Sequence, residues 1–135
     1  MCIRDRIILD DVDMEYAVRS ATFGSFFHQG QICLNTRRII IQRGIYKEFL
    51  GKFVARTKSL PAGDPLNPHT IIGPIITRDA VKMIDDRVKE AIARGAKAHA
   101  GAEYDGQIYS PTILTNVPLD AVSYTHLTLP TIYSV

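Results

Sequence analysis

The stretch FGSFFHQGQICLNTRRIIIQRGIYKEFL, residues 23–50, decides the fold of this chain. Its middle, RRIIIQ, is compact and β-branched, which predicts a strand at about residues 38–42. The letters that follow place Ile45, Phe49 and Phe53 four residues apart, and this spacing predicts a helix. Upstream, Gly30 ends another helical pattern, so Cys33 lies in irregular backbone or at the start of a short helix.

The sequence before this stretch predicts a strand end and a helix. Residues 7–9 form a short apolar run, and Asp10 or Asp11 can cap the helix that follows. That helix has one face of mostly small side chains, which lets it lie close to a sheet: Met14, Ala17, Val18, Ala21 and Ser25.

The sequence after this stretch continues the alternation of helix and strand. Proline and glycine punctuate residues 61–76, which predicts a loop with several turns. Thr77 can cap the next helix, which stops at Arg94 and Gly95. Its apolar stripe consists of Val81, Ile84, Val88, Ala91 and Ile92. AKAHA and YSPTILTNV predict two further strands, so the class is α/β with at least part of a parallel sheet.

Composition and charge argue against several classes of protein. The formal net charge of +2 on 135 residues is too small to indicate a nucleic-acid or membrane partner. No apolar run approaches the roughly 18 residues that span a bilayer, and the N-terminus lacks the apolar region of a signal peptide. Cys2 and Cys33 do not make a disulfide framework. We therefore expect free thiols and a cytoplasmic setting.

Both ends of the chain differ from its middle. MCIRDR at the start and VSYTHLTLP at residues 122–130 resemble peptides encoded by sequencing-adapter DNA. Residues 122–135 also lack a helical period. We therefore expect a non-native end at residues 1–6, a natural segment of one domain at residues 7–121 that is cut at both ends, and a non-native tail at residues 122–135.

Cys33 has two interpretations. A free cysteine usually packs as a small hydrophobe. Cys33, however, follows a break bounded by glycine, where backbone N–H groups are more often unpaired and can stabilise a thiolate. This position favours a reactive thiol on a loop.

The same residues resemble the nucleophile segment of the NAD(P)-dependent aldehyde dehydrogenases, which carry the pattern F-x-x-x-G-Q-x-C-x-x-x-x-R before an IY helix. GDPLNPHTIIGPIIT, ARGAKAHAG and YSPTILTNV match that family in the same order, so the resemblance covers nearly all of residues 7–121. FFHQGQIC is most similar to the benzaldehyde, salicylaldehyde and vanillin dehydrogenase branch. The resemblance implies an α/β fold, a partial parallel-sheet catalytic domain of the aldehyde dehydrogenase type.

A mechanism follows from the resemblance. Cys33 would be the catalytic nucleophile, and its attack on an aldehyde would give a thiohemiacetal whose oxyanion is held partly by the Cys33 N–H. Hydride transfer to NAD or NADP would leave a thioester, which water hydrolyses to a carboxylic acid. Phe27, Ile32 and Leu34 would bind the substrate and favour an apolar, aromatic aldehyde over a charged semialdehyde.

Other parts of the family pattern fall outside this chain. The general-base glutamate, the oxyanion-hole asparagine and the cofactor-binding half lie upstream in the family, and no Gly-rich dinucleotide motif occurs here. A glutamine and a lysine that contact the cofactor ribose in some members correspond to Ala80 and Met83, so no cofactor-binding residue is assigned. We expect the fragment to be inactive alone and the full-length enzyme to be a homo-oligomer.

Two other functions remain open. The chain could be a non-catalytic α/β scaffold or assembly domain, or a thiol hydrolase with a Cys33–His28 dyad. His69 and His99 have no cysteine or carboxylate at a metal-ligand spacing, so no metal site is predicted. Asp85 and Asp86 are adjacent on a helix and are expected to form a solvated surface.

Overall fold

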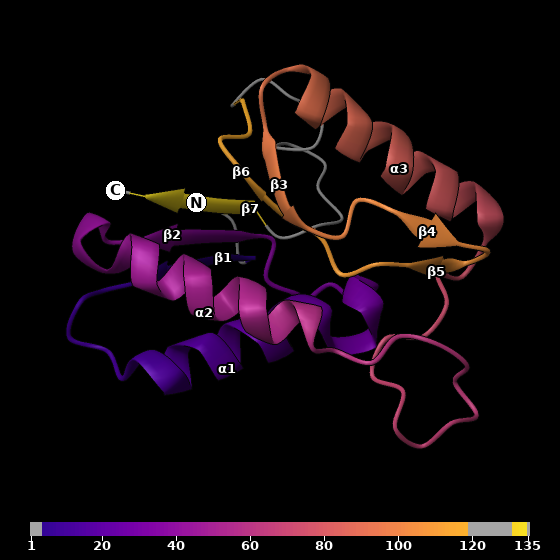
Figure 1. The fold of residues 1–135 in the computed structure, drawn as a ribbon, viewed down its shortest axis with the longest axis horizontal. Coiled ribbons are helices and arrows are strands. Elements are labelled where there is room, and N and C mark those ends of the chain that lie inside the picture. Colours follow the sequence, from indigo (N-terminus) through magenta and orange to yellow (C-terminus); the bar gives the residue numbers. More distant parts are fainter. Residues whose placement is uncertain (1–3, 119–130, 135) are drawn as a thin grey trace.

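The fold has three layers, with a sheet between a pair of helices on one face and a single helix on the other (Figure 1). The computed structural model describes residues 4–118 and 131–134. Its helices are α1 (Met14–Phe26), η1 (Phe27–Gly30), η2 (Arg43–Ile45), α2 (Tyr46–Lys58) and α3 (Arg78–Ala93). Its strands are β1 (Asp5–Ile8), β2 (Arg38–Ile41), β3 (Lys97–Ala100), β4 (Tyr104–Asp105), β5 (Ile108–Tyr109), β6 (Ile113–Thr115) and β7 (Thr131–Ser134).

The main sheet has the strand order β1-β2-β7-β6-β3. Its first four strands pair in parallel, and β3 adds an antiparallel edge against β6. β4 and β5 form a separate hairpin. The predicted α/β class with a parallel sheet is therefore confirmed, and β3 makes the sheet mixed.

Parts of both predicted non-native ends belong to this sheet. β1 begins at Asp5, inside the predicted end at residues 1–6, and β7 comes from the predicted tail. The side chain of Asp5 is 3% exposed and accepts two hydrogen bonds of 2.7 Å from Arg38. Cys2 and residues 119–130 lie outside the described residues, and the origin of the two ends stays a prediction.

Asp13, and not Asp10 or Asp11, caps helix α1. Its carboxylate accepts a hydrogen bond of 2.7 Å from the Tyr16 N–H. Asp10 is bound elsewhere, because the Gln42 amide donates to its carboxylate at 2.6 Å and accepts from its N–H at 2.9 Å. The predicted small-residue face is confirmed: Ala17, Val18, Ala21 and Ser25 are buried.

The two faces of the sheet carry two separate cores. Helices α1 and α2 cover one face, where Phe49, Phe53, Ile39, Ile41 and Ile113 are fully buried in what we call the first core. Helix α3 covers the other face, where Val81, Val88, Ala91 and Leu114 form the second core. Because neighbouring residues of a strand point to opposite faces, Ile113 belongs to one core and Leu114 to the other.

Helix α3 confirms its predicted cap but departs from its predicted stripe. The Thr77 hydroxyl accepts from the Ala80 N–H at 3.1 Å. Ile92 is 40% exposed, whereas Asp85 is only 5% exposed, so the prediction of a solvated Asp85 is wrong. Its carboxylate accepts from the Lys89 ammonium at 2.6 Å and from the Tyr109 hydroxyl at 3.3 Å. Burial, and next the nearby Asp85 charge, raise the pKa of Tyr109 above its ordinary value.

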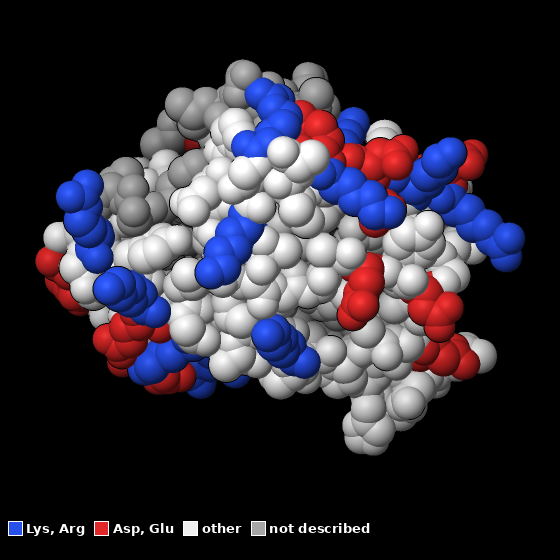
Figure 2. Space-filling view, turned by 45° about the horizontal axis from the view of Figure 1, so that its top comes forward, with Lys and Arg blue, Asp and Glu red and all other residues white. Residues whose placement is uncertain are grey.

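Charged side chains of both signs are interspersed on the face seen in Figure 2, where no broad patch of one sign appears. Among the described residues, no helix has the length and apolar character needed to cross a membrane.

Candidate functional site

The backbone reverses direction sharply between α1 and β2, and this reversal presents Cys33. Helix α1 ends at Phe26, and the next turn contains three successive residues in the left-handed region: His28 (φ 49°), Gln29 (φ 56°) and Gly30 (φ 74°). Left-handed backbone is unfavourable for residues with a side chain. Residues 27–37, which we call the nucleophile turn, therefore need contacts from elsewhere to hold their shape.

Asn35 supplies most of these contacts from inside the nucleophile turn. Its side chain is buried, and its amide nitrogen donates to the carbonyls of Gly24 and Phe27, each at 3.0 Å. Its amide oxygen accepts from the Ile32 N–H at 3.0 Å, while its own N–H donates to the Ile32 carbonyl at 3.3 Å. The Asn35 side chain thus ties the end of α1 to the residues on both sides of Cys33.

The end of α1 packs closely on the nucleophile turn. The Thr36 N–H donates to the Gly24 carbonyl at 2.8 Å. A Cβ atom on Gly24 would lie 2.8 Å from the Thr36 hydroxyl, so this approach requires glycine. After Thr36 the chain enters β2, where the ion pair between Arg38 and Asp5 fixes its first residue.

Cys33 is exposed, in the middle of the short turn closed by Asn35. Within the part of the chain that the structure describes, its backbone N–H has no hydrogen-bond partner. Cys33 lines a pocket of about 540 Å³ between the nucleophile turn and the start of α3. Ile32, Ile75, Ala80, Met83 and Ile84 form the apolar part of its lining. An exposed thiol beside an unpaired N–H has the arrangement needed to attack a carbonyl and hold the resulting oxyanion.

Arg37 is a cation on the same pocket. Its guanidinium donates to the Gly30 carbonyl at 2.9 Å, and two of its other nitrogens, Nε and Nη1, are buried without a partner among the described residues. Burial, and then repulsion from Arg4, lower the pKa of Arg37 to about 10. Arg37 therefore remains charged at neutral pH and favours negative charge near the turn.

A second pocket, of about 450 Å³, lies on the aromatic side of the turn. The rings of Phe23 and Phe27 stack with centroids 4.8 Å apart, and the His28 ring meets Phe27 edge-on at 4.6 Å. Arg19 and Arg56 also line this pocket. Stacked aromatic rings offer a flat apolar surface that suits another planar ring. Gln29 lines both pockets.

The predicted substrate residues do not share one pocket. Phe27, 44% exposed, lines the aromatic pocket, and Ile32 lines the Cys33 pocket. Leu34 is 70% exposed beside Cys33. Ala80 and Met83, to which no cofactor contact was assigned, lie on the Cys33 pocket. The roles of these residues stay predictions.

The geometry does not support the Cys33–His28 dyad. His28 lines the aromatic pocket, whereas Cys33 lines the other pocket, and no hydrogen bond joins them among the described residues. In the same residues no group of three or more histidine, cysteine or acidic side chains could hold a metal ion.

Three polar residues of the turn are not predicted from the sequence: Asn35, Gln29 and Gln31. Gln31 accepts from the Ile76 N–H at 2.9 Å, a contact across 45 residues of sequence. From sequence alone, a polar side chain next to a reactive cysteine is expected to be solvated. Hydrogen-bond partners that lie far along the chain give no local signal. The useful hint was the density of amide side chains between Gln29 and Asn35, in a segment that has little room for secondary structure.

Comparison with known proteins now assigns the family. The model of the aldehyde dehydrogenase family matches residues 4–126, most of the chain. The chain belongs to the aldehyde dehydrogenase family. Among curated aldehyde dehydrogenases, a salicylaldehyde dehydrogenase of Pseudomonas putida is 44% identical over 119 residues, which are 87% of this chain and 25% of that protein. A benzaldehyde dehydrogenase of Bacillus subtilis is 42% identical over 111 residues, which are 82% of this chain and 23% of that protein.

Solved aldehyde dehydrogenase structures share this fold. A salicylaldehyde dehydrogenase from Pseudomonas putida G7, complexed with salicylaldehyde, matches with a TM-score of 0.89 at 37% identity over 97% of this chain and 28% of that one. A betaine aldehyde dehydrogenase from Staphylococcus aureus, in complex with NAD+, matches with a TM-score of 0.93 at 27% identity over 98% of this chain and 28% of that one. The resemblance inferred from the sequence is confirmed, and the chain spans about a quarter of the length of its curated relatives.

Proposed function

We propose that the full-length protein oxidises aromatic aldehydes to carboxylic acids and that Cys33 is its nucleophile. The observation that carries the proposal is the exposed Cys33 thiol, on a pocket, next to its own unpaired N–H. A thiol buried among aliphatic side chains would have had no access to a carbonyl.

The covalent steps use atoms that this chain provides. The Cys33 sulfur, as thiolate, forms a bond to the aldehyde carbon, and the carbonyl oxygen becomes an oxyanion within reach of the Cys33 N–H. Loss of hydride from that carbon restores the C=O bond and leaves a thioester on Cys33. Attack by water then breaks the carbon–sulfur bond and releases the carboxylate, the Cys33 thiolate and two protons, which pass to solvent. Asn35 would hold the Ile32–Asn35 turn still through these steps, because it bonds backbone atoms at both ends of it.

The hydride acceptor in this proposal is NAD or NADP, which supplies the redox chemistry when bound. The apolar lining of the Cys33 pocket, with Ile75, Met83 and Ile84, fits a flat nicotinamide ring. Two structural relatives are described as complexes with NAD+ and with NADP, so both cofactors occur among proteins of this fold. The chain itself offers one wall of such a site, and for this reason we propose that it is inactive alone.

The aromatic pocket supports the proposed substrate class. Phe23 and Phe27 form its ring-bearing wall, and Gln29 lines both this pocket and the Cys33 pocket. Relatives named for salicylaldehyde, benzaldehyde and vanillin point to the same class of substrate. A planar ring resting against Phe27 would bring its aldehyde carbon toward the nucleophile turn.

The test is a steady-state assay of the full-length protein with benzaldehyde, hexanal and succinic semialdehyde, each with NAD and with NADP. We expect the highest kcat/KM for benzaldehyde, and loss of turnover in Cys33→Ser. Equal turnover by Cys33→Ser and wild type would overturn the nucleophile, and a preference for succinic semialdehyde would overturn the substrate class. Size-exclusion chromatography of the same protein tests the expected homo-oligomer.

A further inference from the structure

Residues 73–76, which we call the strap, run between the nucleophile turn and the β4–β5 hairpin. On the hairpin side, the Ile75 N–H donates to the Gln107 carbonyl at 2.7 Å, and the Gln107 amide donates to the Ile75 carbonyl at 2.8 Å. The Ile75 side chain is buried in the second core. The strap is therefore anchored to the hairpin and to the second core through Ile75.

The other edge of the strap faces the nucleophile turn and is bound by Gln31. The Gln31 amide oxygen accepts from the Ile76 N–H at 2.9 Å, and its nitrogen donates to the Pro74 carbonyl at 3.5 Å. The backbone groups of residues 74 and 76 thus point one way and those of Ile75 the other, as in an extended strand. A side-chain amide takes the place that a neighbouring strand would occupy.

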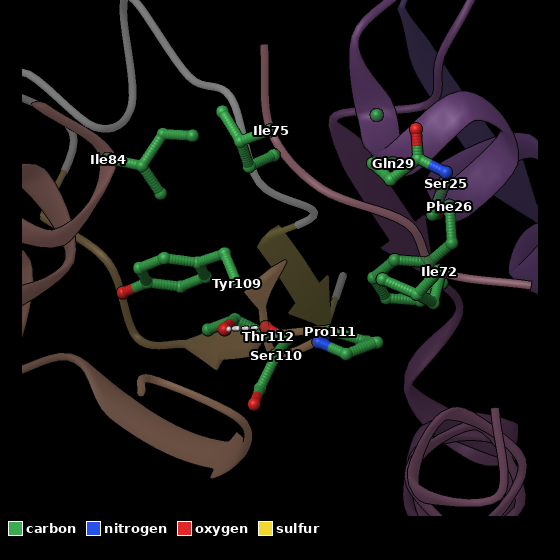
Figure 3. Close-up of a pocket in the computed structure, with 11 residues that line it drawn as sticks. Ser25, Phe26, Gln29, Ile72, Ile75, Ile84, Tyr109, Ser110, Pro111 and Thr112 are labelled. Carbon is green, nitrogen blue, oxygen red and sulfur yellow. Dashed lines mark hydrogen bonds between the residues drawn. The ribbon is translucent and has the colours of Figure 1, made fainter. Parts of the chain in front are cut away.

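Gln29 makes a second contact from the turn to the strap. In the amide orientation that gives both of its polar atoms a partner, its oxygen accepts from the Gly73 N–H at 3.0 Å and its nitrogen donates to the His28 carbonyl at 3.1 Å. A Cβ atom on Gly73 would lie only 3.3 Å from the Gln29 amide. Gln29 from the turn and Ile75 from the strap both line one cavity of about 30 Å³ (Figure 3).

We propose that Gln31 and Gln29 are positioning residues, which set the direction of the Cys33 thiol by fastening the nucleophile turn to the strap. This proposal rests on the proposed function. His28, Gln29 and Gly30 are all left-handed, so the backbone before Cys33 has no regular ladder to hold it. Gln31 lies two residues before Cys33, and its side chain makes hydrogen bonds that pairing with a neighbouring strand would otherwise provide.

We expect the removal of the Gln31 side chain to misdirect the Cys33 thiol and to leave the fold intact. Gln31 is exposed, so its removal leaves the freed groups of Pro74 and Ile76 open to water and costs little stability. A displacement of the nucleophile of about 1 Å can lower a rate about a hundredfold. A residue with only a structural role would change the denaturation midpoint and leave the chemistry of the remaining folded protein as it was.

The experiment compares Gln31→Ala with Gln42→Ala in the full-length enzyme. Gln42 is a matched control, because its amide also makes two hydrogen bonds, of 2.9 and 2.6 Å, but to Asp10 beyond the other end of β2. Three quantities are measured: kcat for benzaldehyde, the pH profile of the rate at which iodoacetamide alkylates Cys33, and the thermal denaturation midpoint. Cys33→Ser identifies the part of the alkylation that belongs to Cys33.

We expect Gln31→Ala to lower kcat by about tenfold or more and to change the alkylation profile, with an unchanged midpoint. Gln42→Ala should match wild type in all three. Gln31→Ala within twofold of wild type in kcat and in alkylation overturns the proposal. If Gln31→Ala does not fold, Gln31→Glu decides by the same criterion, because it keeps the acceptor for Ile76 and loses the donor to Pro74. Alkylation needs no turnover, so the proposal is tested even if Cys33→Ser shows the proposed function to be wrong.

Discussion

The nucleophile turn and strand β2 are consecutive in the chain but are stabilised in opposite ways. In β2, Ile39 and Ile41 are fully buried and the backbone pairs with strands on both sides. In the turn, Cys33 and Leu34 are exposed, Asn35 is buried, and two residues with side chains adopt left-handed backbone. β2 is held by apolar packing, whereas the turn is held by side-chain hydrogen bonds to the backbone. A reactive group can be exposed in this way because the turn is supported by the buried Asn35 amide and not by burial of the Cys33 side chain itself.

The largest expected effect is the loss of chemistry without loss of fold. Cys33→Ala should lower kcat/KM for benzaldehyde in the full-length enzyme by a factor of about a thousand or more, since no other group can form the thioester. Because the thiol is exposed, the urea denaturation midpoint should stay within error of wild type. Steady-state kinetics check the expected loss of activity, and urea titration checks the expected unchanged stability. A variant that keeps a tenth of the wild-type rate would remove Cys33 from the reaction.

The converse effect, a loss of stability without a change in the reactivity of Cys33, is expected from a substitution in β2. Ile39→Ala removes a fully buried side chain from the first core and should lower the free energy of unfolding by about 2–5 kcal/mol. At a temperature where the variant is folded, the alkylation rate of Cys33 should remain that of wild type. A changed rate would show that the turn depends on the apolar core more than its hydrogen bonds indicate.

Substitution of Asn35 is expected to lower both stability and turnover. Asn35→Ala frees the Ile32 N–H and removes the amide donor from the Gly24 and Phe27 carbonyls, of which the first still accepts from the Thr36 N–H, and this should cost about 2 kcal/mol of stability. Turnover should fall as well, because the same bonds hold both ends of the Cys33 turn. Asn35→Asp keeps the acceptor for Ile32 and is the matched control for the lost donors. Unchanged turnover in a folded Asn35→Ala would limit Asn35 to a structural role.

These contrasts show what the sequence could and could not predict. The α/β class, the helices, the Thr77 cap and the place of Cys33 follow from local patterns of apolar residues, caps and breakers. Asp85 was misassigned, because its partner Tyr109 lies 24 residues away. Gln31 was missed for the same reason, since its partner lies 45 residues away. Polar contacts carry no periodicity, whether they are as local as those of Asn35 or as distant as those of Gln31, and they shape the site.

Substitutions of two glycines in helices distinguish the effect of close packing on stability from the effect of helix propensity. Gly24→Ala places a Cβ atom 2.8 Å from the Thr36 hydroxyl and should destabilise the protein by about 1–2 kcal/mol. Gly51→Ala in α2 meets nothing within 4 Å and should stabilise it by about 0.5–1 kcal/mol. Urea titrations of both variants measure the difference. Two shifts of the same sign would show that the turn can move away from α1.

The smallest expected effect lies outside both regions and depends on pH. The folded protein raises the pKa of Tyr109, mainly through burial, so its neutral form is stabilised on folding. This contribution is complete below the unfolded pKa of about 10 and decreases above it by at most about 1.4 kcal/mol per pH unit. Tyr109→Phe should therefore lose less stability than wild type between pH 9 and about 11. Parallel pH dependences in urea titrations would contradict this assignment.

The position of strand β6 between the two cores determines how the protein unfolds. Ile113 is packed among the α1 and α2 side chains, and its neighbour Leu114 among those of α3, on a single short segment of backbone. Solvent that reaches one of these residues must disturb the strand that carries the other. The amide protons of both helical layers should consequently exchange with deuterium in one cooperative opening, and the two layers should not behave as separately melting units.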